Sequence, residues 1–108
     1  MFKGKLCVIV GADNLESLTH AKYFAKSGCN IAFMDSNKAL GIRFADVVKK
    51  EYGVKVFFFH GSTSSEEDLD IFKAATLDQF GPVDFLINGT DTRFLIATYP
   101  SSWYTGRV

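Results

Sequence analysis

The stretch Leu6-Cys-Val-Ile-Val-Gly-Ala-Asp-Asn-Leu-Glu-Ser17 joins an apolar run, a glycine and the start of a helical pattern. The run Leu6–Val10 does not alternate with polar residues, which indicates a strand buried on both faces. A strand that ends in glycine and leads directly into a helix is typical of the first β-α unit of a parallel sheet. This stretch therefore predicts an α/β fold.

Three further apolar runs follow, at Ile31–Met34, Val54–Phe59 and Val83–Ile87. Each is rich in Val, Ile or Phe, and none alternates with polar residues, so we expect all of these strands to be buried on both faces. Such strands form parallel sheets that are covered by helices on both sides.

Three helical stretches separate the runs, over about residues 13–27, 37–52 and 65–80. Each has start and stop signals: Asp13 with Glu16 and Ser65 with Asp68 resemble capping boxes, and glycine follows each helix. The apolar stripes expected to face the sheet are Leu15, Leu18, Ala21 and Ala25 in the first helix, Leu40, Phe44, Val47 and Val48 in the second, and Leu69, Phe72, Thr76 and Phe80 in the third.

The chain thus has the order β-α-β-α-β-α-β, followed by a C-terminal tail. Right-handed crossovers are nearly obligatory in such units, and they predict the strand order 3-2-1-4 in a three-layer, Rossmann-like sheet. The 108 residues are enough for one domain, which we assign to residues 1–108. A receiver-like domain would need an acidic phosphoacceptor at the third strand, where His60-Gly61 stands instead.

Composition excludes several classes of partner. The formal net charge is zero and hydrophobic residues make up 47%, so neither a nucleic-acid-binding surface nor a basic membrane-binding surface is expected. The first apolar run has five residues, too few for a signal core or a membrane span. The two cysteines, Cys7 and Cys29, form no C-x-x-C motif, so we expect free thiols and a cytoplasmic location.

Glycine and small polar residues gather where the predicted strands end, at 11–14, 35–37, 60–63 and 88–91. Ligands of open α/β sheets bind at these carboxyl ends, near the point where the strand order reverses. Gly11 can serve either a phosphate or a simple turn. Asp35 lies 24 residues after Gly11, a spacing that suits a carboxylate on a ribose 2′-hydroxyl, although it can equally cap the following helix. In the ribose role it would repel a 2′-phosphate and so favour NAD over NADP.

The two histidines give little evidence of chemistry. His20 falls on a helix, where we expect a surface residue, and His60 falls at the rim of the strand ends. Neither has cysteine or aspartate at a metal-binding spacing, so no metal site is expected.

Taken together, these segments resemble the short-chain dehydrogenase/reductase family. Val10-Gly-Ala-Asp-Asn-Leu-Glu-Ser17 stands where that family has Thr-Gly-x-x-x-Gly-x-Gly, and Phe80-Gly-Pro-Val-Asp-Phe-Leu-Ile-Asn88 is similar to its Phe-Gly-x-x-Asp-x-Leu-Val-Asn. Thr98-Tyr-Pro-Ser-Ser-Trp103 resembles the start of its fourth helix. The resemblance implies a cofactor site whose candidate residues in this chain are Gly11, Asn14, Leu15, Asp35, Asn88 and Gly89.

The departures from the family pattern weaken this expectation. Leu15 and Ser17 replace two of the three motif glycines, and Asp13 and Glu16 bring carboxylates to the helix N-terminus that a phosphate would use. The acidic residue that follows the family's third strand is absent, with Gly61 near its place. NAD binding is therefore expected to be weak or lost.

Catalytic residues are not found. The residues four places after the four tyrosines are Ser27, Val56, Trp103 and Val108, so no Tyr-x-x-x-Lys is present. Without that lysine, nothing lowers the pKa of a tyrosine toward working pH, and we expect no hydride transfer by this chain alone.

Two functions remain open. One is a truncated or degenerate dehydrogenase-like protein that retains the fold and some affinity for NAD. The other is a non-catalytic interaction module that has lost the cofactor. In the second, Phe85 and Ile87 would lie on a bare sheet edge, which a homodimer or higher oligomer would cover with help from the Arg93–Val108 tail.

Overall fold

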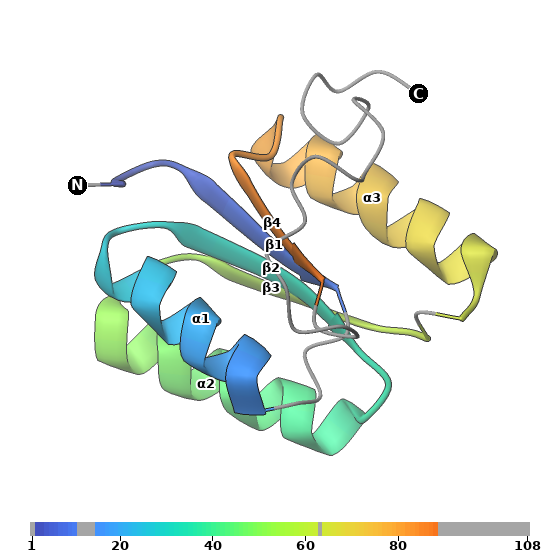
Figure 1. Cartoon of the computed structure of the whole chain (residues 1–108), viewed down its shortest axis with the longest axis horizontal. Coiled ribbons are helices and arrows are strands. Elements are labelled where there is room, and N and C mark those ends of the chain that lie inside the picture. The colour runs from blue at the N-terminus through green and yellow to red at the C-terminus, as the bar shows by residue number, and fades with distance from the viewer. Residues whose placement is uncertain (1, 11–14, 63, 89–108) are drawn as a thin grey trace.

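The computed structural model describes residues 2–10, 15–62 and 64–88, and these form a four-stranded parallel sheet between two layers of helices (Figure 1). The elements follow one another as β1 (Leu6–Val10), α1 (Leu15–Lys26), β2 (Asn30–Asp35), α2 (Lys38–Tyr52), β3 (Val56–His60), α3 (Glu66–Phe80) and β4 (Phe85–Asn88). The strand order is β3-β2-β1-β4, which confirms the predicted topology.

The two faces of the sheet have separate cores, because alternate residues of each strand point to opposite sides. Cys7 and Ile9 of β1 pack with Ala21 and Ala25 of α1. Val8 faces the other way and joins the cluster that contains residues of α3 and β4. Figure 1 shows α1 and α2 together on one face and α3 on the other. The sheet is thus covered on both sides, as the unbroken apolar runs predicted.

β3 differs from this prediction. β1 is buried throughout, whereas β3 is only half-buried and His60 at its end is exposed. In the described part of the chain β3 pairs with β2 alone, so it forms an edge of the sheet. Its phenylalanines still reach the core: the Phe57 ring stacks on Phe72, and Phe58 lies 5.0 Å from the Phe33 ring, centroid to centroid.

The sheet-facing side of α2 was also predicted wrongly in part. Val48 is buried as expected, but Leu40 is 51% and Val47 41% exposed, and the buried positions are instead Gly41 and Ala45. The cause is the ring of Phe58, which fills the space beneath the helix. A Cβ at Gly41 would lie 2.2 Å from that ring. Only small residues leave room for the ring, so the side of α2 with Gly41 and Ala45 packs on the sheet.

Side-chain caps fix the helix ends. Asn37 Oδ1 accepts the backbone N–H of Leu40 at 3.0 Å, so Asn37 precedes α2 as its N-cap rather than opening it. Ser65 caps α3 through the N–H of Asp68, but the Asp68 carboxylate accepts from Ser62 rather than from Ser65. The predicted capping box therefore forms only in one direction. The predicted cap of the first helix, Asp13, lies outside the described residues.

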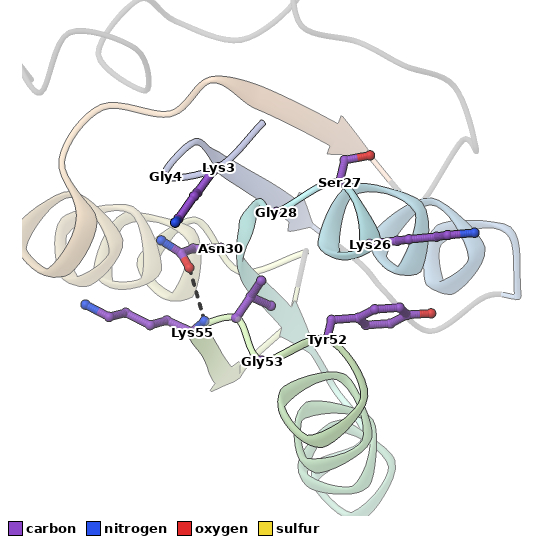
Figure 2. Close-up of a pocket in the computed structure, with 10 residues that line it drawn as sticks. Lys3, Gly4, Lys26, Ser27, Gly28, Asn30, Tyr52, Gly53 and Lys55 are labelled. Atoms are coloured by element: carbon purple, nitrogen blue, oxygen red, sulfur yellow. Dashed lines mark hydrogen bonds between the residues drawn. The ribbon is translucent and has the colours of Figure 1, made fainter. Parts of the chain in front are cut away.

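The loops at the amino ends of the strands are joined by polar contacts. Asn30 Oδ1 accepts the backbone N–H of Lys55 at 3.1 Å, which ties the start of β2 to the loop before β3 (Figure 2). The Phe2 N–H donates to the Ser27 carbonyl at 2.8 Å and so anchors the chain before β1. These contacts hold three loops side by side.

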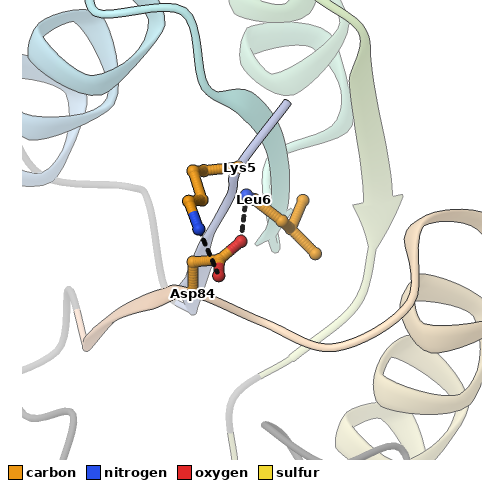
Figure 3. A network of polar contacts seen from close by, with 3 residues as sticks. All are labelled: Lys5, Leu6 and Asp84. Carbon is orange, nitrogen blue, oxygen red and sulfur yellow. Dashed lines mark hydrogen bonds and ion pairs between the residues drawn. The ribbon is translucent and has the colours of Figure 1, made fainter. Parts of the chain in front are cut away.

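Asp84 joins β4 to β1 (Figure 3). Its Oδ2 accepts the Leu6 N–H at 2.8 Å, its own N–H donates to the Leu6 carbonyl at 3.0 Å, and its Oδ1 lies 3.9 Å from the Lys5 ammonium. We expect Asp84→Ala to lower the free energy of unfolding in urea by about 1–2 kcal/mol, because the Leu6 N–H loses a charged acceptor. Asp78→Ala, at an exposed position of α3, is the control and should change little. Equal effects of the two substitutions would refute the role given to Asp84.

Thr76 carries a buried hydroxyl. Its side chain is fully buried on α3, and its Oγ1 has no hydrogen-bond partner in the described part of the chain. A buried polar group without a partner costs stability, so we expect the isosteric change Thr76→Val to raise the free energy of unfolding by about 1 kcal/mol. Ala74→Val, at an exposed position of the same helix, controls for the helix propensity of valine. A loss of stability in Thr76→Val would show that the hydroxyl has a partner.

Candidate functional site

The carboxyl ends of the four strands lie along one edge of the sheet. Val10 is in register with Met34 on one side and with Asn88 on the other, and Asp35 is in register with His60. The parallel register therefore brings three of the four polar strand ends to the edge where the ligand site was predicted, at Asp35, His60 and Asn88. Of the other predicted cofactor residues, Gly11, Asn14 and Gly89 lie outside the described residues. Leu15 is placed only as the first residue of α1, and Asn88 only as the last of β4.

Asp35 is the best-defined group at this edge. Its side chain is only 4% exposed, and its Oδ1 accepts the backbone N–H of Asn37 at 2.9 Å. The helix cap itself is Asn37, so Asp35 supports the turn before α2 rather than capping the helix. The hydrogen bond to Oδ1 thus holds the carboxylate in place at the end of β2.

A backbone contact and a histidine fix the loops on either side of Asp35. The Gly61 N–H donates to the Asp35 carbonyl at 3.2 Å, and His60 Nε2 lies 3.1 Å from the Ser36 carbonyl oxygen. Sequence reasoning placed His60 at the rim but missed its contact with Ser36, which joins residues 24 apart in the chain. The rim of the site is therefore held by contacts between β2 and β3.

The acidic residue that the resembling family carries near this position is replaced by Gly61, and the packing around Gly61 accounts for its absence. A Cβ at this position would lie 2.7 Å from the Phe59 ring and 3.2 Å from the Asp68 Cβ. The space is closed to a side chain unless both neighbours move. An acidic side chain at position 61 would therefore not fit without a shift of Phe59 and Asp68.

His20 and the cysteines do not form a reactive site in the described part of the chain. His20 was expected on the surface, but it is half-buried, and its Nδ1 is buried without a partner among the described residues. Cys7 and Cys29 are free thiols, as predicted, and both are buried. Burial raises the pKa of the Cys7 thiol well above its ordinary value, and burial together with the charge of Asp84 raises the pKa of Cys29 to about 11. Both thiols are therefore protonated at neutral pH and poor nucleophiles.

The described residues also contain no group of three His, Cys, Asp or Glu side chains that could hold a metal ion. None of the helices among them is both long enough and apolar enough to cross a membrane.

The side chains of β4 differ from the prediction of an apolar sheet edge. Ile87 is fully buried, and Phe85 is half-buried with its ring 4.8 Å from Phe24 and 5.0 Å from Phe2, centroid to centroid. Both side chains therefore belong to the core of this chain. Among the described residues, β4 pairs only with β1, so its second edge offers backbone groups rather than apolar side chains.

Comparison with known proteins places this fold in a family. The sequence profile described as short chain dehydrogenase matches residues 5–96. The NADP-dependent mannitol dehydrogenase of Hypocrea jecorina is 31% identical over 88 residues, which are 79% of this chain and 33% of that protein. L-sorbose reductase from Gluconobacter frateurii, solved with NADPH and L-sorbose, has a TM-score of 0.75 and 27% identity over 80% of this chain and 33% of its own.

NAD+-bound xylitol dehydrogenase gives the same TM-score of 0.75 with 30% identity, and again the match covers 80% of this chain and 33% of the relative. This chain therefore spans about a third of the length of these relatives. The strand order of the sheet and the match over residues 5–96 agree with one another. The chain belongs to the short-chain dehydrogenase family.

Proposed function

We propose that this chain is the cofactor-binding half of a short-chain dehydrogenase fold and that it holds a nicotinamide dinucleotide, with NAD preferred, at the carboxyl edge of its sheet. The observation that carries the proposal is Asp35, a nearly buried carboxylate at the end of β2 whose Oδ1 is fixed by the Asn37 N–H. A fixed carboxylate at the end of the second strand suits the ribose 2′-hydroxyl of NAD.

The same carboxylate disfavours a 2′-phosphate, because two negative charges would meet at a nearly buried position where water screens them poorly. The relatives include both a protein solved with NADPH and one solved with NAD+, so the family alone does not decide between the two cofactors. The preference for NAD therefore rests on Asp35, and it departs from the NADP dependence of the mannitol dehydrogenase.

We expect the affinity for NAD to be low. Leu15 and Ser17 replace glycines that let the backbone approach a pyrophosphate, and Asp13 and Glu16 add negative charge at the start of α1. The double substitution Leu15→Gly with Glu16→Ile should strengthen NADH binding about tenfold, measured by calorimetry. Binding by the variant alone would support the alternative function, an interaction module that has lost its cofactor.

We also propose that this chain does not transfer hydride without further residues. No tyrosine of the sequence is followed four places later by lysine, so the usual proton donor of the family is missing. Incubation of the chain with NADH and a sugar ketone should leave the absorbance of NADH unchanged. A turnover that follows the protein through purification would refute this.

The interaction alternative makes a separate prediction about assembly. In the described part of the chain, β4 has one edge without a strand partner, and unpaired edges favour association. We propose that the chain forms a homodimer or higher oligomer through this edge and the tail. Light scattering at about 0.1–1 mM protein should give at least twice the monomer mass. A clean monomer across that range would count against the proposal.

The cytoplasmic location, which rests on two free thiols, likewise stays a prediction.

A further inference from the structure

A cavity of about 580 Å³ opens at the amino ends of β1, β2 and β3. Its lining comes from three segments of the chain, within residues 3–4, 26–30 and 52–55 (Figure 2). The volume falls in the range of small-molecule sites. Asn30 lines the cavity at one end of β2, and Asp35 lies at the other end of the same strand, about 16 Å away for five residues of extended chain. The cavity is therefore separate from the proposed cofactor site.

The charged side chains that line the cavity are all positive. Lys3, Lys26 and Lys55 contribute to the lining, and no acidic residue does. Among the described residues Lys5 pairs with Asp84, and no ion pair is found there for Lys3, Lys26 or Lys55. Lys26 lies in the last turn of α1, where it complements the helix dipole. Lys3 and Lys55 lie outside the helices, so the dipole does not account for their placement.

Asn30 adds an uncharged hydrogen-bond donor to the three lysines of the lining. Its Oδ1 must face Lys55, because the backbone N–H of Lys55 donates to it at 3.1 Å. This fixes the orientation of the amide and leaves the NH₂ group, which has two donors, on the other side. Figure 2 shows that nitrogen turned away from the Lys55 backbone and toward the side on which Lys3 lies. The lining thus contains ammonium and amide donors and, among the residues that form it, no acidic side chain.

Two glycines with positive φ form part of the lining. Gly28 has φ +102°, and a Cβ there would lie 3.0 Å from the Lys3 Cα, so a side chain would displace the segment that carries Lys3. Gly53 has φ +69°, and no atom lies within 4 Å of the position that a Cβ would take, so the lining beside Lys55 has no side chain at this residue. Tyr52 and Val54 add apolar surface. The lining can therefore hold an organic group as well as a charged one.

We propose that this cavity binds a small phosphate-bearing anion with at least two negative charges, with the phosphate between Lys3, Asn30 and Lys55. A phosphate presents oxygens in three directions, which suits donors that come from three separate segments, whereas a carboxylate presents two oxygens in one plane. The ligand class is thus a phosphorylated small molecule, bound on the edge of the sheet opposite to the cofactor.

The test is a titration of the whole chain with inorganic pyrophosphate at constant ionic strength, followed by ¹H–¹⁵N correlation spectra. We expect saturable shifts at the amides of Lys3, Gly28 and Lys55, and none at Gly61 beside Asp35. Citrate, added at the same charge concentration, should cause smaller shifts. Equal shifts with citrate would overturn the assignment to phosphate, and no saturable shift up to about 10 mM pyrophosphate would overturn the site.

Variants separate this site from general attraction to a basic surface. Lys3→Ala with Lys55→Ala should weaken pyrophosphate binding at least tenfold. Lys22→Ala with Lys50→Ala removes the same charge from exposed positions outside the lining and should change binding less than twofold. Asn30→Asp keeps an acceptor for the Lys55 N–H but adds a negative charge, so it should keep the circular dichroism spectrum and abolish binding. Equal losses in the two lysine pairs, or full binding by folded Asn30→Asp, would refute the proposal.

Discussion

Substitution of Phe33 by alanine is expected to lower the free energy of unfolding by about 3–5 kcal/mol, the largest effect of any single change discussed for this chain. Phe33 lies in the middle of β2 and is 0% exposed. Its ring is 5.2 Å from Phe44 of α2, edge to face, and 5.0 Å from Phe58 of β3, centroid to centroid. Removal of the ring would leave a cavity between a helix and two strands, and a small domain has only about 5–15 kcal/mol of stability to lose.

Urea unfolding followed by circular dichroism measures this loss. Phe33→Leu retains most of the buried volume and should cost roughly a third as much, which makes it the matched control. Phe44→Ala, at a half-buried position on the same contact, should fall between the two. A loss below about 1 kcal/mol for Phe33→Ala would mean that the packing of α2 on β2 and β3 is not the main core of the fold.

The second large effect concerns the choice of cofactor. Asp35→Asn is expected to change the ratio of NADPH to NADH affinity by about 50-fold in favour of NADPH, or roughly 2.3 kcal/mol. The amide oxygen still accepts the Asn37 N–H, so the turn before α2 is retained. The negative charge is lost, and with it the repulsion of a 2′-phosphate. The change is therefore specific to recognition and not to folding.

Fluorescence titration of the reduced cofactors measures both affinities in the same buffer. Asp46→Asn, an exposed carboxylate on α2, removes the same charge away from the edge and should leave the ratio unchanged. A ratio in Asp35→Asn equal to that of the natural chain would show that Asp35 supports the turn only. Asp35→Ala also removes the acceptor for the Asn37 N–H. Its effect on the free energy of unfolding therefore measures how much this hydrogen bond stabilises the turn.

The arrangement of the strands was predictable because it depends on local patterns and a strong rule of chirality. Unbroken apolar runs such as Leu6–Val10 define the strands, and right-handed crossovers leave few possible orders. The face of α2 was not predictable in the same way. Its periodicity allows both the stripe of Leu40 and that of Gly41, and the choice is made by the Phe58 ring of a strand that comes later in the chain.

The candidate site was likewise predictable only in part. The position of Asp35 followed from its spacing after Gly11 and from its place at the end of a strand. Its nearly complete burial and its bond to Asn37 did not, because they depend on how the turn closes over the carboxylate. The lysine-lined cavity could not be predicted either, since it is formed by three loops that only the parallel register brings together.

The central claim, that Asp35 makes this chain a binder of NAD rather than NADP, is tested most directly by titration of the natural chain with NADH and with NADPH at equal ionic strength. We expect NADH to bind at least about tenfold more tightly than NADPH, a difference of about 1.4 kcal/mol. NADPH binding as tightly as NADH, or no binding of either at about 5 mM, would contradict it.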